Sequence, residues 1–234
     1  MTETIRPSLI SEQVFRALCQ EILSGRYQPG EKLPTQRALA ADAGVNMASI
    51  REAVKRLEQL RLVEVRQGDA MRVNDWRADG GLDMIAHVLF RAGGLDRGTL
   101  ESVLEARRLM LAEAARLAAG RRTEGQAARL HELAERIAET TDPAAAQRLD
   151  WSFMSELVEA GGNLVFVLIL NSIRQLYLEH ADAFNAVVQD LEGLAPLYRR
   201  AAVAVEAGSA GRAAGAVSRL AGLQEERLVR ALGG

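Results

Sequence analysis

Residues 33–57 read LPTQRALAADAGVNMASIREAVKRL, and their spacing predicts two short helices joined by a tight turn. Pro34 is suited to the start of the first helix, and Gly44 is suited to its end because glycine tolerates a left-handed backbone. Asn46 is a good cap for the second helix, whose apolar side chains fall on one face: Ile50, Val54 and Leu57. Two helices joined in this way form a helix-turn-helix.

The flanking sequence completes a winged form of this motif. Upstream, residues 9–24 repeat apolar side chains at helical spacing and predict a further helix. Downstream, apolar and polar residues alternate over 63–66 and again over 71–73, which predicts two strands joined by a turn at 67–70. We therefore expect residues 1–75 to form a winged helix-turn-helix, with three helices and a two-stranded β-wing.

The rest of the chain predicts a second, all-helical domain. Residues 76–81 are polar and contain glycine, so we place a linker there and the second domain at 82–234. Helices are expected at 82–93, 97–119, 123–140, 143–160, 164–185, 190–207 and 210–232. The run Leu164–Leu170 is apolar on every side, which predicts the central helix of a bundle. The expected fold class is mainly α, with an antiparallel bundle of about six to seven helices behind the first domain.

Charge limits the ways in which the chain can bind nucleic acid. The formal net charge of the whole chain is −2, so it would not coat DNA as a polycation. Residues 26–72, however, carry nine basic and six acidic residues, a local charge of +3. Any contact with DNA is therefore expected to be local and to involve the first domain.

Nothing in the sequence predicts a membrane protein. The longest apolar run is Leu164–Leu170, seven residues, whereas a membrane-spanning helix needs about 20. The N-terminus lacks the basic and then apolar pattern of a signal peptide. We expect a soluble, cytoplasmic protein. Its single cysteine, Cys19, excludes an internal disulfide and is expected to be a buried, inert thiol.

The first turns of the predicted recognition helix carry the side chains best placed to reach DNA bases, because a helix in the major groove presents its N-terminal residues to the groove floor. Arg51 suits a bidentate contact with guanine. Asn46 and Ser49 can bind a base or a phosphate. Met47 and Ala48 offer only apolar contact, for example with a thymine methyl group.

Two further places are suited to DNA contact. Arg37, near the start of the preceding helix, can hold a phosphate or reach a base, and the wing tip Gln67-Gly68 allows the backbone to approach a groove closely. Taken singly, such an arginine is more often a solvated charge, and Asn46 can act as a helix cap alone. The order of helices, turn, capped helix and wing is what favours DNA binding.

Residues 33–57, preceded by ILSGRYQPGEKL at 22–33, closely resemble the DNA-binding signature of the GntR family of bacterial regulators. The resemblance continues through VNDW at 73–76, LDWSF at 149–153 and LILN at 168–171, which are similar to the helical effector domain of the FadR subfamily. It implies a homodimer that binds a palindromic operator in double-stranded DNA. By resemblance, the DNA contacts fall on Arg37, Asn46, Met47, Ala48, Ser49, Arg51 and the wing tip Gln67-Gly68.

The chain departs from the metal-binding pattern of that subfamily. Many of its effector domains bind a divalent metal through an aspartate and histidines, and this chain keeps Asp150 but has Met154, Tyr198 and Leu220 at the matching histidine positions. None of these side chains can replace an imidazole at a metal. The histidines that the chain does have are scattered over different predicted helices: His87, His131 and His180. We therefore expect no metal and no cofactor.

Without a metal, the resemblance favours the acyl-CoA-responsive branch of the subfamily, in which a buried arginine and aromatic side chains line the ligand pocket. Arg107, Tyr177 and Phe184 align with those positions. The alternative is that these residues are structural, with Arg107 in an internal ion pair and the two rings in the core. Gln224 and Leu228 stand where the acyl-CoA regulators carry a serine and a tryptophan. The implied effector is an acyl-CoA or a related apolar acid.

The sequence leaves three functions to be distinguished. The leading hypothesis is a ligand-controlled homodimeric repressor or activator, with fatty acid metabolism as the implied context. The alternative is a DNA-binding regulator whose helical domain only dimerises, because the same apolar residues can line a cavity or fill a core. An enzyme is not expected, because no Ser/His/Asp, Cys/His or metal-ligand cluster and no glycine-rich phosphate loop appears in the sequence.

Overall fold

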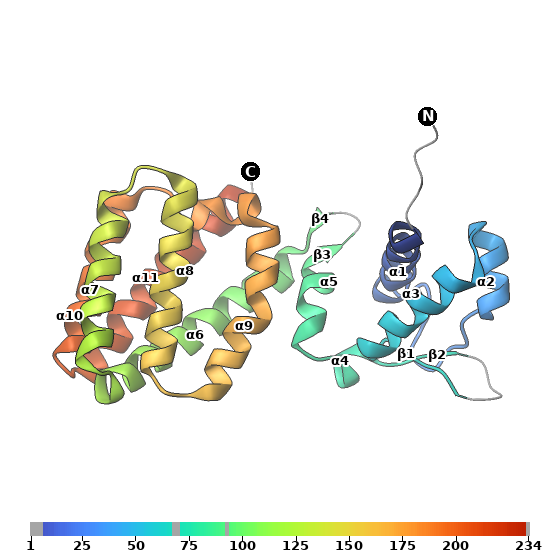
Figure 1. Cartoon of the computed structure of the whole chain (residues 1–234), viewed down its shortest axis with the longest axis horizontal. Coiled ribbons are helices and arrows are strands. Elements are labelled where there is room, and N and C mark those ends of the chain that lie inside the picture. The colour runs from blue at the N-terminus through green and yellow to red at the C-terminus, as the bar shows by residue number, and fades with distance from the viewer. Residues whose placement is uncertain (1–6, 67–70, 92–93, 233–234) are drawn as a thin grey trace. The chain divides into compact units, whose positions relative to one another are not determined.

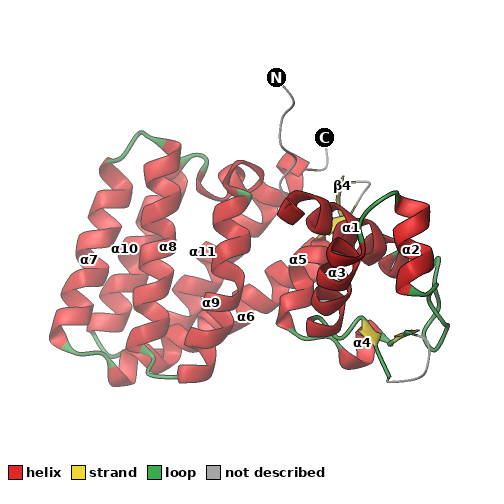
Figure 2. Cartoon of the chain, turned by 45° about the vertical axis from the view of Figure 1, so that its right-hand side comes forward, coloured by secondary structure: helices red, strands yellow, loops and turns green. Residues whose placement is uncertain are grey.

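The structure is a computed structural model that describes residues 7–66, 71–91 and 94–232 (Figure 1). The chain divides into two compact units, Met1–Asp96 and Arg97–Gly234. Figure 2 shows that the described strands lie in the first unit, whereas the described part of the second unit consists of helices and loops. The predicted fold class, mainly α with a helix-turn-helix before a helical domain, is confirmed.

The first unit contains the expected helices and wing strands. They are α1 (Pro7–Leu23), α2 (Gln36–Ala43), α3 (Met47–Gln59), β1 (Val63–Glu64) and β2 (Arg72–Val73). β1 and β2 pair antiparallel, with Val63 opposite Val73. An isolated antiparallel bridge also pairs Lys32 with Arg72 of β2, so a third segment lies beside this sheet. The sequence did not predict this pairing.

Local capping explains where α2 and α3 begin and end. The Thr35 hydroxyl accepts a hydrogen bond from the Ala38 amide at 3.2 Å at the start of α2. Gly44 ends that helix with φ of 63°, the left-handed conformation for which glycine carries no steric penalty. The side chain of Asn46 then accepts from the amide of Ser49 at 2.8 Å and starts α3. The turn between the helices is thus fixed by short-range interactions.

The segment after the wing belongs to the first unit. It forms α4 (Trp76–Asp79), a 3-10 turn η1 (Leu82–Met84), α5 (Ile85–Leu89) and the strand pair β3 (Phe90–Arg91) and β4 (Gly94–Leu95). The boundary between units therefore falls after Asp96, later than the expected linker at 76–81, and α5 is much shorter than the helix expected at 82–93. The physical reason is that Met84 and Val88 are buried in the core of the first unit.

The second unit is built from α6 (Arg97–Arg121), α7 (Glu124–Glu139), α8 (Pro143–Ala160), α9 (Leu164–Glu179), the 3-10 segment η2 (Ala181–Val188), α10 (Leu191–Glu206) and α11 (Ala210–Leu232). These bounds follow the expected helices closely, except that α9 ends before η2. Thr123 and Gln126 form a capping box at the start of α7, and Asp142 caps α8 just before Pro143. These local interactions explain why the two helices begin where they do.

The predicted central position of Leu164–Leu170 is wrong. Leu164, Val165 and Leu168 on α9 are 70%, 60% and 55% exposed. α9 contacts α8 and η2 (Figure 1), while the largest fully buried side chains of this unit come from other helices, for example Phe153 on α8 and Tyr198 on α10. An apolar circumference thus does not place a helix at the centre, because one face of α9 remains open within this chain.

Two expectations concern the chain as a whole: an inert thiol at Cys19 and no membrane-spanning helix. Cys19 is buried, and burial raises the pKa of its thiol to about 12, as expected for an inert thiol. Among the described residues, no helix combines the length and the apolar character needed to cross a membrane.

Candidate functional site

The N-terminal turns of α3 form the exposed face of the helix-turn-helix. Asn46, Ala48 and Arg51 are exposed and Met47 is half-buried, while the opposite stripe of the helix is buried in the core: Ile50, Ala53, Val54 and Leu57. The amphipathic sequence of α3 therefore directs its first turns outward. Glu52 and Lys55 share this exposed surface.

Asn46 caps α3 with its side-chain oxygen, and its side-chain amide group can still donate to another partner. Its Oδ1 atom accepts the hydrogen bond from the Ser49 amide, so the oxygen is committed to the helix cap. The side chain is nevertheless exposed, and the Nδ2 group keeps two donors. Asn46 can therefore donate to a phosphate or a base acceptor, but it cannot offer the bidentate donor and acceptor pair that would read adenine.

Ser49 differs from the expectation. Its side chain is only 2% exposed, and its hydroxyl has no hydrogen-bond partner among the described residues. The helical phase explains this, because Ser49 is adjacent to the buried stripe that begins at Ile50. The structure therefore does not support a direct DNA contact by the Ser49 side chain.

The remaining candidates of the first unit lie in two places. Arg37 is exposed in the first turn of α2, where backbone amides of the helix N-terminus also favour a phosphate. Gln67 and Gly68, the predicted wing tip, lie outside the described residues. The structure thus places Arg37, Asn46, Ala48 and Arg51 on exposed positions of the helix-turn-helix.

A buried polar cluster joins four helices of the second unit. Asp150 on α8 accepts at Oδ1 from the hydroxyl of Tyr198 on α10 at 2.5 Å and from Nε2 of Gln224 on α11 at 2.9 Å. Arg107 on α6 donates to Oε1 of Gln224 at 2.9 Å, and its guanidinium lies 3.9 Å from Oδ2 of Asp150. Burial, with the nearby charge of Asp150, raises the pKa of Tyr198 well above its ordinary value. Tyr198 is therefore a neutral hydrogen-bond donor.

The cluster bears on the question of a metal. Within the described residues, no group of three or more His, Cys, Asp or Glu side chains could hold a metal ion. One oxygen of Asp150 already accepts two hydrogen bonds from Tyr198 and Gln224. The sequence had singled out these positions one by one, but their mutual hydrogen bonding was not predicted, because residues from different helices meet only in the fold.

Aromatic side chains stack beside this cluster. Tyr177 stacks on Trp151 with ring centroids 5.2 Å apart and on Phe184 at 5.5 Å. Burial and the charge of Asp150 raise the pKa of Tyr177, and the charge of Arg107 opposes this shift. The structure therefore brings together the three predicted ligand residues, Arg107, Tyr177 and Phe184. Trp151 joins them, although the sequence analysis had quoted it only as part of a motif.

Comparison with known families gives two matches along the chain. The model for bacterial regulatory proteins of the gntR family matches residues 10–73, and the FCD domain model matches residues 102–222. The HTH-type transcriptional regulator Mce2R of Mycobacterium tuberculosis is 36% identical over 199 residues, which cover 85% of this chain and 83% of that protein. A fatty acid metabolism regulator protein of Erwinia tasmaniensis is 27% identical over 161 residues, covering 68% of this chain and 66% of that protein.

Solved structures show the same fold. One of them is the structure of Lar, described as controlling expression of the Listeria monocytogenes agr system, with a TM-score of 0.59 and 17% identity. The alignment covers 94% of this chain and 96% of that one. At this identity the likeness concerns the fold alone.

The burial of Ser49 leads to a prediction about DNA contact. Ser49→Ala removes a buried hydroxyl without a partner, so we expect the free energy of unfolding to stay the same or to rise by about 1 kcal/mol. Specific DNA affinity should stay within about threefold of wild type, below the cost of a lost base contact. Urea denaturation and fluorescence anisotropy measure the two quantities. A tenfold loss of affinity in a stably folded variant would show that Ser49 reaches DNA after all.

The polar cluster leads to a second prediction. Tyr198→Phe removes a donor to a buried carboxylate, which should lower the free energy of unfolding by about 1.5 to 3 kcal/mol. Tyr27→Phe, at a half-buried tyrosine of the first unit, serves as the matched control and should cost less than about 0.5 kcal/mol. Denaturation followed by circular dichroism tests both. Equal costs for the two variants would contradict a stabilising role of the Tyr198 to Asp150 hydrogen bond.

Proposed function

Because this chain belongs to the GntR family of bacterial regulatory proteins and carries an FCD domain, we propose that it acts as a homodimer on a palindromic operator and that a small apolar acid controls its affinity for DNA. Binding of DNA and regulation of transcription are properties of the family. The matching families and relatives are regulators rather than enzymes. The proposal therefore concerns the operator, the dimer and the effector.

The exposed face of α3 supports recognition of DNA by Asn46, Met47, Ala48 and Arg51. Arg51 is the one guanidinium among these residues and is exposed on the helix, so it is suited to a bidentate contact with guanine O6 and N7. Met47 and Ala48 supply an apolar patch that favours thymine methyl groups. Arg37 would hold the backbone of the duplex, and the wing tip Gln67-Gly68 would let the backbone approach a groove closely.

A single helix of this kind reads only a few base pairs. Two copies related by a two-fold axis would place two α3 helices on successive half-sites, about one helical turn apart. A palindromic operator is the DNA counterpart of that symmetry. A ligand that changes the spacing of the two helices would weaken both contacts at once, which gives a repressor or an activator its switch.

Arg107 carries the case for an acidic effector. Its side chain is 18% exposed, and a guanidinium has five donors, of which the hydrogen bond to the neutral oxygen of Gln224 uses one. Asp150 lies 3.9 Å away and has its own partners in Tyr198 and Gln224. The remaining donors of Arg107 are suited to the carboxylate or thioester oxygen of a ligand. The rings of Trp151, Tyr177 and Phe184 would pack against its apolar body.

These features support a fatty acyl-CoA or a related apolar acid as the effector. One relative carries the name of a fatty acid metabolism regulator, and a role in that metabolism is the context we propose. The alternative is a helical domain that only dimerises, in which the same side chains form a filled core.

Arg51 provides the test of DNA recognition. Arg51→Ala should weaken binding to a duplex that the wild type selects from a randomised pool by about 1 to 3 kcal/mol. The fold should remain intact because the side chain is exposed. Fluorescence anisotropy measures the affinity, and a scrambled duplex of the same composition is the control. Wild-type affinity of Arg51→Ala for the selected duplex would show that α3 is not read as proposed.

The effector is tested by release of DNA. Palmitoyl-CoA, palmitate and free coenzyme A are titrated into the complex with the selected duplex, and we expect palmitoyl-CoA or palmitate to weaken binding about 5- to 150-fold. Arg107→Gln should reduce this response, with thermal unfolding as a check of its fold. DNA binding that is indifferent to all three compounds would favour the alternative of a helical domain for dimerisation alone.

A further inference from the structure

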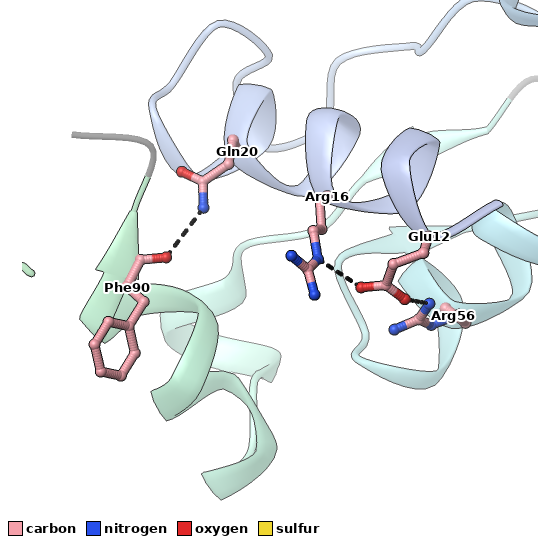
Figure 3. Close-up of polar contacts among 5 residues, drawn as sticks. All are labelled: Glu12, Arg16, Gln20, Arg56 and Phe90. Carbon is pink, nitrogen blue, oxygen red and sulfur yellow. Dashed lines mark hydrogen bonds and ion pairs between the residues drawn. The ribbon is translucent and has the colours of Figure 1, made fainter. Parts of the chain in front are cut away.

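The segment that leads out of the first unit is held against α1. Figure 3 shows Gln20 on α1 donating a hydrogen bond to the carbonyl oxygen of Phe90 on β3, at 3.4 Å. One turn earlier in the segment, the ring of His87 on α5 meets the ring of Phe15 on α1 edge to face, with centroids 5.4 Å apart. α5 and β3 lie just before Arg97, the first residue of α6.

Phe15 also contacts the recognition helix. The guanidinium of Arg56 on α3 lies over the Phe15 ring, 4.1 Å from its centroid. Glu12 on α1 pairs with this guanidinium and also with Arg16 at 2.6 Å (Figure 3). Phe15 itself is 1% exposed. One buried ring thus touches both α5 and α3.

We propose that Glu12, Phe15, Arg56 and His87 form a relay in which the position of α5 on α1 sets the position of the recognition helix. The inference rests on the proposed function, because it explains how a signal from the helical domain reaches DNA. None of the four residues contacts DNA in this proposal. They are positioning residues that act through the packing of α1 on α3 and α5.

The relay contains a titratable group. His87 faces Arg56 on α3, Glu12 and Arg16 on α1, and Asp83 on η1. Burial lowers the pKa of His87 below its ordinary value of 6.5, and the charges of Arg56 and Arg16 lower it further, against the opposing charges of Glu12 and Asp83. The neutral ring is thus the form that packs on Phe15. Protonation would place a second cation beside Arg56 inside the unit.

The direction of the pH effect follows from this shift. Because the pKa of His87 is lower in the folded protein than in the unfolded chain, its packing contributes full stability above pH 6.5. This contribution is lost as the pH falls below that value. Acidification should therefore loosen α5 from α1 and release the constraint on α3.

The experiment compares full-length wild type, His87→Gln and His131→Gln at pH 7.5 and 5.5. The control replaces a histidine of the second unit that pairs with Glu206. The first readout is affinity for the selected duplex, and the second is hydrogen exchange of residues 47–59 without DNA, expressed as protection factors. Wild type and His131→Gln should lose about fivefold or more in affinity at pH 5.5, with reduced protection of α3. His87→Gln should show neither change.

Two outcomes would overturn the relay. One is a pH response of His87→Gln equal to that of wild type, and the other is protection of 47–59 that does not change with pH in the wild type. If no duplex is selected by the wild type, the proposed function fails, whereas the exchange measurement still decides the relay. If His87→Gln does not fold, His87→Phe keeps a ring against Phe15 and replaces it in both measurements.

Discussion

The burial of one face of α3 against α1 is the constraint on which the DNA-binding unit depends. Ile50, Ala53, Val54 and Leu57 are committed to that core, and the helical repeat then leaves the opposite face, with Arg51, no place except the surface. The same packing turns Ser49 inward. Apolar burial therefore decides which polar side chains α3 can present to DNA.

The second unit shows how polar groups can specify a packed bundle. Asp150, Tyr198, Gln224 and Arg107 come from four helices, and each helix must hold its own register for the hydrogen bonds to form. Apolar side chains alone would tolerate small slips between helices, because dispersion contacts have little directionality. The cluster also leaves Arg107 partly exposed and close to stacked rings. In the proposed function, stability and ligand recognition thus draw on the same residues.

Much of this architecture could be predicted from local signals. Gly44 and Asn46 mark helix ends through capping chemistry that involves only near neighbours, so the helices before and after them were placed well. The segment 82–96 was not, because Met84 and Val88 join the first core through contacts distant in sequence. The open face of α9 was missed for the same reason: an apolar run says that burial is favourable and does not say where. The exposed positions of the proposed DNA-binding face followed from helical phase, but the inward turn of Ser49 needed the packed structure.

The low reactivity of Cys19 is useful for experiments that follow motions of this protein with site-specific labels. It is the single cysteine of the chain, it is buried on α1, and its thiol has a pKa of about 12, so almost no thiolate is present at neutral pH. Maleimide dyes and thiol-reactive spin labels would therefore react poorly with Cys19. An extra cysteine placed on an exposed site, such as the outer face of α2, could be tagged selectively while the native thiol stays in place.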